Sequence, residues 1–310
     1  MTGAFELRGV TKRYGGTTAL RDVTVQVPTG SITGLVGRNA SGKTTLLRHV
    51  TGMVLPDEGE CLTLGKPARK LGRFELSRMG VVHQDDALPE WMRTSQLLRY
   101  VSSFYEVWDR ELERSLLSRL ELDPEAKVGT LSPGMRQRLA LMVATCHRPE
   151  LLLLDEPLNH LDPMARRDLL AVLLEFFTPE ATTIVISSHM LRDIEPLVDR
   201  ILCLDRGRVT AHDTLDDLKE RYSEWIVTSP EGRLPASFTE PYVVSARGDA
   251  HRARLIVRDG GPHAASFRDV HRAVVEPMPL NLEGLFSLLV TGGVASADSL
   301  APEPGETGTS

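Results

Sequence analysis

The sequence lacks the features that mark secreted or membrane-spanning proteins. Its three cysteines, Cys61, Cys146 and Cys203, are scattered through apolar stretches without ligand spacing. We expect small core residues in a reducing cytoplasm and no disulfide or metal site. The longest apolar run, Leu169 to Leu174, falls far short of the ~20 residues that cross a bilayer, and the N-terminus lacks the basic and apolar regions of a signal peptide. The chain should therefore be soluble by itself.

An excess of positive charge is also missing. The 310 residues carry a formal net charge of −6, whereas proteins that bind nucleic acid normally present a basic patch or stripe. We therefore expect no nucleic-acid partner. The length allows one substantial core and a second, smaller unit, and the sequence shows no internal repeat.

A glycine-rich loop stands between an apolar run, Ile32 to Val36, and a segment with helical apolar spacing. It reads Gly37-Arg38-Asn39-Ala40-Ser41-Gly42-Lys43-Thr44, which has the spacing G-x-x-x-x-G-K-T. In such a loop the backbone N–H groups and the positive end of the following helix cradle phosphates, Lys43 reaches the β- and γ-phosphates, and the Thr44 hydroxyl can ligate Mg²⁺. A chance match is the alternative for the isolated motif.

Two adjacent carboxylates follow a second apolar run. Leu151 to Leu154 predicts a strand covered on both faces of a parallel sheet, and Asp155 and Glu156 come directly after it. Ligands of open α/β sheets bind at the carboxyl ends of the strands, so Asp155 could hold Mg²⁺ and Glu156 could polarise an attacking water. An acidic strand end exposed to solvent is the plainer alternative, and the upstream phosphate loop argues against it.

Between these two motifs the sequence resembles the ATP-binding cassette family, the motor subunits of ABC transporters. The segment Leu131 to Gln137, reading L-S-P-G-M-R-Q, is similar to the family's signature sequence. Four further matches occur in the family's order, and the resemblance covers roughly residues 4 to 222. They are Tyr14 before the first buried strand, Gln84 after Val81-Val82, Asn159-His160-Leu161-Asp162, and His189 after Ile184 to Ser188.

The resemblance implies an α/β P-loop NTPase cassette over residues 1–222, with an inserted helical subdomain at about 85–147. Apolar stripes at helical spacing between Leu97 and Cys146 agree with that subdomain. Short runs rich in β-formers predict a small accessory β-rich domain over 223–290, closed by an apolar helix, and the composition of 291–310 is typical of a disordered tail.

The family's site residues map onto this chain as expectations. Tyr14 would stack on the adenine of ATP, Glu156 would act on the attacking water, and His189 would contact the γ-phosphate. Gln84 belongs with Glu156 and His189 in catalysis and with Thr44 and Asp155 as a ligand of Mg²⁺. The remaining nucleotide contacts would come from Gly37, Asn39, Ser41, Gly42, Lys43, Thr44, Thr45 and Asp162, and, acting on a second chain's nucleotide, from Ser132 and Gly134.

Three positions depart from the family's commonest pattern. Ala40 replaces a glycine, which we expect to be tolerated only with a negative φ, because a side chain in the left-handed region costs about 1–2 kcal/mol. Pro133 removes an N–H donor but suits the first helical position after Ser132 as N-cap. Met135 replaces a glutamine and forfeits a hydrogen bond worth roughly 1 kcal/mol. Such departures can also mark one half of an asymmetric heterodimer.

The resemblance also implies partners. They are an integral-membrane permease and a second ATPase chain, which would place the protein in the cytoplasm, peripherally on the inner face of the cell membrane. The segment Asp85 to Met92 would meet the permease, with Trp91 and Met92 as interface anchors or, alternatively, as core residues.

Details of the sequence resemble ATPases of ABC-2-type exporters. They are the L-S-x-G-M signature and the segments Phe104 to Asp109 and Asn281 to Phe286. An importer ATPase and a soluble ABC protein without a transport role are the alternatives. A third treats His251, His263 and His271 as a metal or ligand sensor, although no tight ligand spacing supports it.

Overall fold

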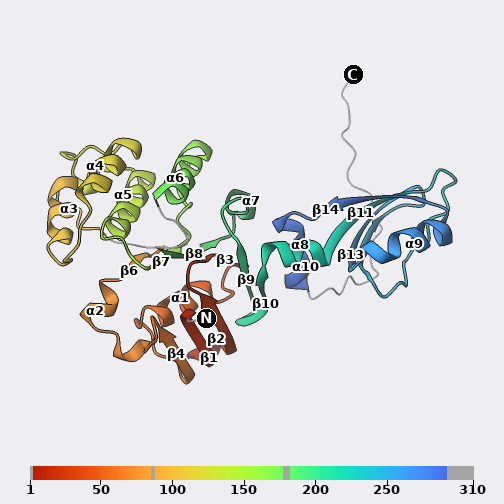
Figure 1. Ribbon diagram of the computed structural model, residues 1–310, viewed down its shortest axis with the longest axis horizontal. Coiled ribbons are helices and arrows are strands. Elements are labelled where there is room, and N and C mark those ends of the chain that lie inside the picture. The colour runs from red at the N-terminus through yellow and green to blue at the C-terminus, as the bar shows by residue number, and fades with distance from the viewer. Residues whose placement is uncertain (1–2, 85–87, 177–181, 292–310) are drawn as a thin grey trace. The chain divides into compact units, whose positions relative to one another are not determined.

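The computed structural model describes residues 3–84, 88–176 and 182–291 (Figure 1). By its internal contacts the chain divides into two compact units between His212 and Asp213. The helix Leu215–Arg221 thus belongs with the second unit, although the sequence placed the boundary after residue 222. None of the described helices is both long and apolar enough to cross a membrane.

A six-stranded sheet forms the centre of the first unit, and its carboxyl edge carries the candidate site. Its strands β3, β7 and β8 are buried along their whole length, which explains their unbroken apolar runs. β9, β3, β8, β7 and β6 are paired in parallel, so their carboxyl ends meet at one edge. The order is β10 (Arg208–Thr214), β9 (Arg200–Asp205), β3 (Ile32–Gly37), β8 (Thr183–Ser188), β7 (Leu151–Asp155) and β6 (Met79–Val82).

An antiparallel sheet packs with helix α1 (Lys43–Val50) against this core. Leu7 and Leu20 of that sheet are fully buried in the same cluster as Leu46 of α1 and Leu35 of β3. The helix that follows the phosphate loop is therefore held on two sides. The sheet order is β2 (Thr17–Pro28), β1 (Gly3–Tyr14), β4 (Glu58–Thr63) and β5 (Lys66–Pro67).

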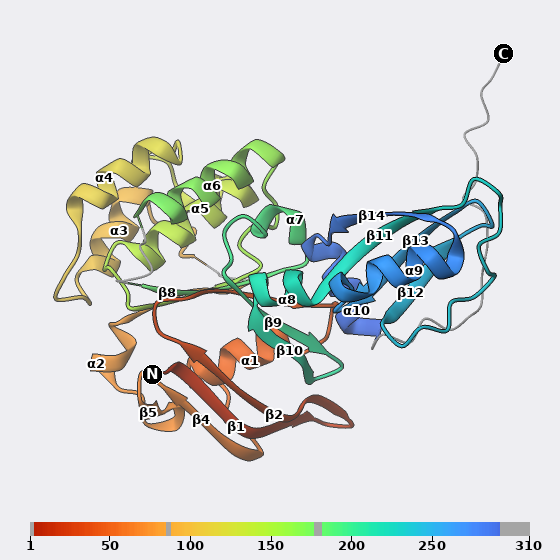
Figure 2. The same cartoon turned by 45° about the vertical axis from the view of Figure 1, so that its right-hand side comes forward.

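The helical subdomain has its own apolar core. Figure 2 shows α3, α4 and α5 gathered together, and their leucines form one buried cluster. Asp109 caps α4 by accepting hydrogen bonds from the backbone N–H groups of Glu111 and Leu112, at 3.0 and 2.8 Å. The helices are α3 (Thr94–Ser102), α4 (Arg110–Arg119), η2 (Val128–Thr130) and α5 (Pro133–Thr145). The remaining helices of the unit are η1 (Ala68–Lys70), α2 (Arg73–Leu76), α6 (Pro163–Phe176) and α7 (Leu191–Ile194).

The second unit is an antiparallel sheet with α9 on one face. Phe267 of α9 is buried with Trp225, Leu255 and Val275 of the sheet (Figures 1 and 2). The sequence predicted its strands and its last helix but missed α9. The sheet order is β12 (Val243–Gly248), β13 (Arg252–Arg258), β11 (Tyr222–Thr228) and β14 (Val274–Pro279), and the helices are α8 (Leu215–Arg221), η3 (Gly261–His263), α9 (Ala264–His271) and α10 (Leu282–Thr291).

The three cysteines are buried and free, as the sequence predicts. Burial raises the pKa of the Cys61 and Cys146 thiols to about 12 and that of Cys203 to about 11. All three thiols are therefore protonated at neutral pH and unreactive.

Candidate nucleotide-binding site

The phosphate loop joins the end of β3 to the start of α1. The Ser41 N–H closes a turn by donating to the Arg38 carbonyl at 3.1 Å, and Gly42 then adopts φ 110°. A Cβ at Gly42 would lie 2.6 Å from the carbonyl oxygen of Ala19, so only glycine fits there. Because α1 begins at Lys43, the first N–H groups of the helix have no intrahelical partner and can receive an anion.

Ala40 contradicts one expectation. Its φ is 61°, in the left-handed region, whereas the sequence argument required a negative value. Ala40 is exposed, so no packing compensates for the strain within the loop. The position keeps the backbone path of a glycine and retains about 1–2 kcal/mol of strain beside the phosphate cradle.

The side chains of Lys43, Glu156 and His189 meet at this loop. Lys43 Nζ donates to the Gly37 carbonyl at 2.9 Å and lies 3.4 Å from Glu156 Oε1. Glu156 Oε2 accepts from His189 Nδ1 at 2.8 Å. Lys43 and Glu156 have side chains 8% and 9% exposed, whereas His189 is 48% exposed. The buried carboxylate thus lies between a lysine that points at the loop and a histidine that reaches solvent.

Asp155 keeps one oxygen free. Its Oδ1 accepts a hydrogen bond of 2.7 Å from Ser187 Oγ, while Oδ2 is buried and has no hydrogen-bond partner among the described residues. Ser187 Oγ also accepts from the Glu156 N–H at 2.8 Å. A buried carboxylate oxygen without a donor fits a hard cation, and Thr44, half-buried at the start of α1, carries a second oxygen ligand. These residues fit Mg²⁺.

Sequence reasoning missed the role of Ser187. It stands directly opposite Asp155 in the parallel pairing of β7 with β8, and its hydroxyl orients Asp155 and the backbone of Glu156. Polar residues at the ends of two apolar strands were the available signal, since parallel neighbours end at the same edge.

The signature segment opens α5. Ser132 is its N-cap and accepts from the Met135 N–H at 3.2 Å, with Pro133 at the first helical position, as predicted from the sequence. Ser132 is exposed. Met135 packs against the core of the helical subdomain, so the apolar side chain gains burial where it forfeits a hydrogen bond.

A hollow of about 440 Å³ lies at this helix end. It is lined from two directions, by the start of α5, including Ser132 and Gly134, and by the segment that precedes α6, including His160 and Asp162. A Cβ at Gly134 would lie 3.0 Å from the His160 carbonyl oxygen, so glycine permits this close approach. Asp162 caps α6 through the N–H groups of Met164 and Ala165, both at 2.9 Å, and these hydrogen bonds lower the pKa of its carboxyl.

The predicted site residues therefore fall into separate groups. Lys43, Asp155, Glu156 and His189 are brought together, and Ser132, Gly134 and Asp162 line the other hollow. Tyr14 ends β1, 47% exposed, with Lys12 Nζ 5.5 Å from its ring centroid. Gln84 is exposed beside Asp85 to Ala87, which lie outside the described residues.

Trp91 and Met92 have different environments. Trp91 is 75% exposed, whereas Met92 is 8% exposed and belongs to the buried cluster of the helical subdomain. The expectation that both residues anchor an interface is therefore wrong for Met92. Its backbone also joins that core, since its carbonyl accepts from the Val128 N–H at 2.9 Å.

The three histidines of the second unit have separate environments. Glu240 Oε1 accepts a 2.5 Å hydrogen bond from His271 Nε2, and His263 stacks on Tyr242. Across the described ranges, no group of three or more histidine, cysteine or acidic side chains is placed to hold a metal ion.

Comparisons with known proteins agree with this geometry. The profile of the family described as ABC transporter matches residues 20–159. Nod factor export ATP-binding protein I of Rhizobium sp. (strain N33) is 34% identical over 77% of this chain and 81% of its own length. ABC transporter ATP-binding protein YtrB of Bacillus subtilis (strain 168) is 29% identical over 91% and 96%.

Solved structures show the same fold. A structure titled "Structure of ATP binding subunit of ABC transporter" has a TM-score of 0.64 and 28% identity, covering 70% of this chain and 92% of its own. The dimeric cassette MJ0796 has a TM-score of 0.61 over 68% of this chain and 98% of its own, at 24% identity. These likenesses confirm the predicted fold class of a P-loop cassette.

Proposed function

The chain belongs to the ABC transporter family of ATP-binding proteins, and from that premise we propose that it is the Mg²⁺-dependent ATPase of an exporter that works with a membrane permease. As a family member it binds and hydrolyses ATP. The observation that carries the proposal is the buried pair of Lys43 and Glu156 at the phosphate loop, with the partly exposed His189 bonded to Glu156.

Hydrolysis needs a carboxylate that can orient or deprotonate water beside the γ-phosphate. Glu156 suits this role because it is buried and directly follows β7, which is separated from β3 and its phosphate loop by β8 alone. Its φ of 52° is a strained conformation that is common at functional sites. The contact between Glu156 and Lys43 would break when Lys43 binds the phosphates of ATP instead. Glu156 would then keep His189 as its partner and become available to water.

Mg²⁺ would be held by Asp155 and Thr44, with Gln84 as the third protein ligand, and would neutralise charge on the phosphates. The partnerless Oδ2 of Asp155 supports this assignment. Tyr14 would stack on the adenine through its exposed ring, and Gly37, Asn39, Ser41, Gly42 and Thr45 would serve the phosphates. The bond from Ser187 would fix Asp155 in place.

A second ATPase chain would complete the site. Ser132 is exposed at the positive end of α5, and the hollow that it lines with Gly134 and Asp162 is open to solvent. We assign these residues to the nucleotide of the opposite chain. The dimeric cassette among the similar structures agrees with such a pairing.

Export through a permease is the finer part of the proposal. The similar proteins from Rhizobium species are named for Nod factor export. The exposed indole of Trp91 is a candidate anchor for a membrane subunit. Peripheral attachment to the inner face of the membrane would follow. The substrate class we favour is a drug, an antimicrobial peptide or a lipid-like molecule.

The test is reconstitution. The chain should copurify from detergent-solubilised membranes with an integral-membrane protein, and Trp91→Ala should weaken that association while leaving basal ATPase activity intact. In vesicles whose ATPase subunits face outward, added Mg-ATP should drive amphiphilic probes into the lumen. ATP-driven release from the lumen, or failure of any membrane protein to copurify, would contradict the export proposal.

A further inference from the structure

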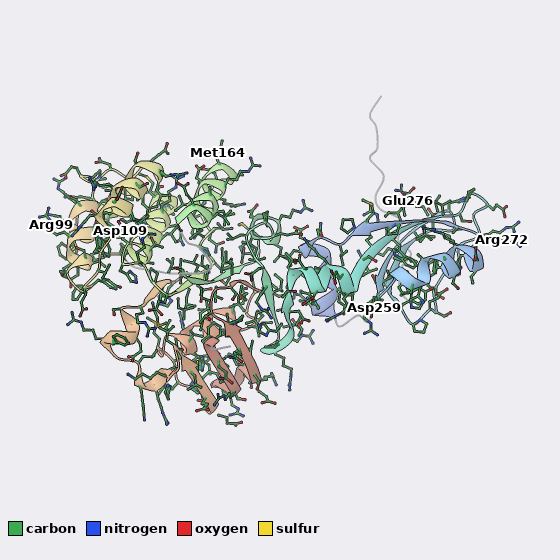
Figure 3. The ribbon with its side chains drawn as sticks, viewed as in Figure 1. Arg99, Asp109, Met164, Asp259, Arg272 and Glu276 are labelled. Carbon is green, nitrogen blue, oxygen red and sulfur yellow. The ribbon has the colours of Figure 1, made fainter. Side chains whose placement is uncertain are left out.

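Among the described residues, no helix packs against one face of the antiparallel sheet of the second unit, and most side chains on that face are exposed or half-buried. Alternation places Trp225, Val227, Leu255 and Val275 on the face that packs against α9. The residues between them must point the other way. Figure 3 shows one of these, Glu276, on the side of the sheet away from α9. We call this second side the open face.

The open face is divided by charge. Its basic half, on β12 and β13, presents Arg247, Arg252 and Arg254, and its acidic half, on β11 and β14, presents Glu224 and Glu276. No acidic residue lies on the open face of the basic half and no basic residue on that of the acidic half, within the described strands.

One cross-strand row shows the division directly. Arg247 is paired with Arg254, Arg254 with Ile226, and Ile226 with Glu276, so the charge changes sign from one edge of the sheet to the other. Directly opposed like charges destabilise a sheet. Neither arginine forms an ion pair with any residue in the described part of the chain.

Apolar side chains accompany the charges. Ile226 and Ile256 are half-buried at the middle of the open face, and Val274 and Met278 on β14 are 54% and 49% exposed. The face therefore combines an apolar centre with two charged halves of opposite sign, which is the composition of an interface more than of a solvated surface.

We propose that the open face pairs with the same face of a second copy of this chain. The two copies would be related by a two-fold axis that runs parallel to the strands, above the open face and over the line between β13 and β11. Under this rotation β12 of one copy lies over β14 of the other. Arg247 then faces Glu276 of the second copy, twice by symmetry. Aligned packing of two sheets about 10 Å apart leaves room for such long side chains to meet.

The area of the open face limits how tightly two copies can bind. Four strands about 4.8 Å apart and six residues of about 3.4 Å each give roughly 400 Å² per copy, or roughly 800 Å² in total. That is below the usual range for stable complexes, so the contact is weak by itself. This inference rests on the proposed function in one respect, which is that two ATPase chains pair around ATP. The contact between the open faces does not need nucleotide and would keep these two chains near each other.

The experiment is sedimentation velocity on the full, nucleotide-free chain carrying Ser132→Arg, which removes the nucleotide-dependent contact. At about 50 μM protein and about 0.1 M salt we expect a monomer–dimer equilibrium that shifts to monomer at about 1 M salt, because exposed charge pairs are screened. Arg247→Glu and Glu276→Arg should each weaken dimerisation by about tenfold, since two attractive pairs become repulsive in each dimer.

The charge-swapped double variant decides the pairing. Arg247→Glu combined with Glu276→Arg restores opposite charges and should return the dimer to within about threefold of its original strength. Asp269→Arg, on the exposed side of α9, is the matched control and should change nothing. A monomer under all these conditions, or single variants without a rescuing double variant, would overturn the inference, while ATP-driven dimers of the Glu156→Gln chain would still support the proposed function.

Discussion

The phosphate-loop half and the signature half of the cassette are built differently. In the first, Lys43 and Glu156 are buried, and Lys43 Nζ lies 3.4 Å from Glu156 Oε1. In the second, Ser132 and Asp162 are exposed, and their side chains cap helices. One half holds its charged side chains inside the chain, and the other presents an exposed helix end to solvent.

Substitutions in the two halves should therefore have different effects. Changes in the buried half should alter chemistry or stability in a single chain. Changes in the exposed half should leave the single chain intact and alter its association with another.

Glu156→Gln should reduce ATP turnover by about 10²–10⁴-fold while leaving ATP affinity nearly unchanged, because the amide cannot accept a proton from water. Steady-state hydrolysis and equilibrium ATP binding check this. Glu150→Gln is the control, since Glu150 lies before the opposite end of β7 and pairs with Arg78. Near-normal hydrolysis by the Glu156→Gln chain would remove Glu156 from the mechanism.

Met92→Ala should lower the free energy of unfolding by about 2–5 kcal/mol, because a buried side chain leaves a cavity in the helical subdomain. Trp91→Ala should change it by less than about 0.5 kcal/mol, since the indole is exposed. Urea unfolding of both variants is the measurement. Equal losses would show that the exposed tryptophan is also part of the core.

Acidification should destabilise the first unit. His49 and His147 are buried. A ring nitrogen of His49 is bonded to the Thr45 carbonyl, and a ring nitrogen of His147 is bonded to the Met79 carbonyl. Burial lowers the pKa of both imidazoles. The unfolded chain therefore binds protons that the native chain does not, and stability present above about pH 6.5 is lost as the pH falls, by up to about 1.4 kcal/mol per pH unit for each histidine.

Thermal unfolding of the first unit between pH 5 and pH 8 tests this. His147→Gln should flatten the slope below pH 6.5, and His160→Asn, an exposed control, should not. An unchanged slope in the His147→Gln chain would assign the acid sensitivity to other groups.

Ala40→Gly should stabilise the chain by about 0.5–1 kcal/mol, because relief of left-handed strain exceeds the added entropy of the unfolded chain. The measurement is the urea concentration at the unfolding midpoint, compared between the Ala40→Gly variant and the unmutated chain. A loss of stability would mean that the alanine is not strained in solution.

Much of the cassette's fold and of its candidate site could be predicted from the sequence. The phosphate loop, the apolar strand before Asp155 and the N-cap at Ser132 are each specified by residues adjacent in sequence. The φ of Ala40 was not predictable, because the loop's closure, not the residue's preference, sets it. Met92 was ambiguous since a methionine beside a tryptophan in a loop carries no periodicity, and α9 was missed because its apolar pattern is short.

The most direct test concerns the claim that the exposed half serves a second chain. Glu156→Gln protein at about 1 μM, where the weak contact of the second unit is dissociated, should become dimeric on addition of ATP, as measured by size-exclusion chromatography with light scattering. Adding Ser132→Arg should abolish that dimer while ATP binding is retained. A double variant that still dimerises with ATP, or one that no longer binds ATP, would contradict the account.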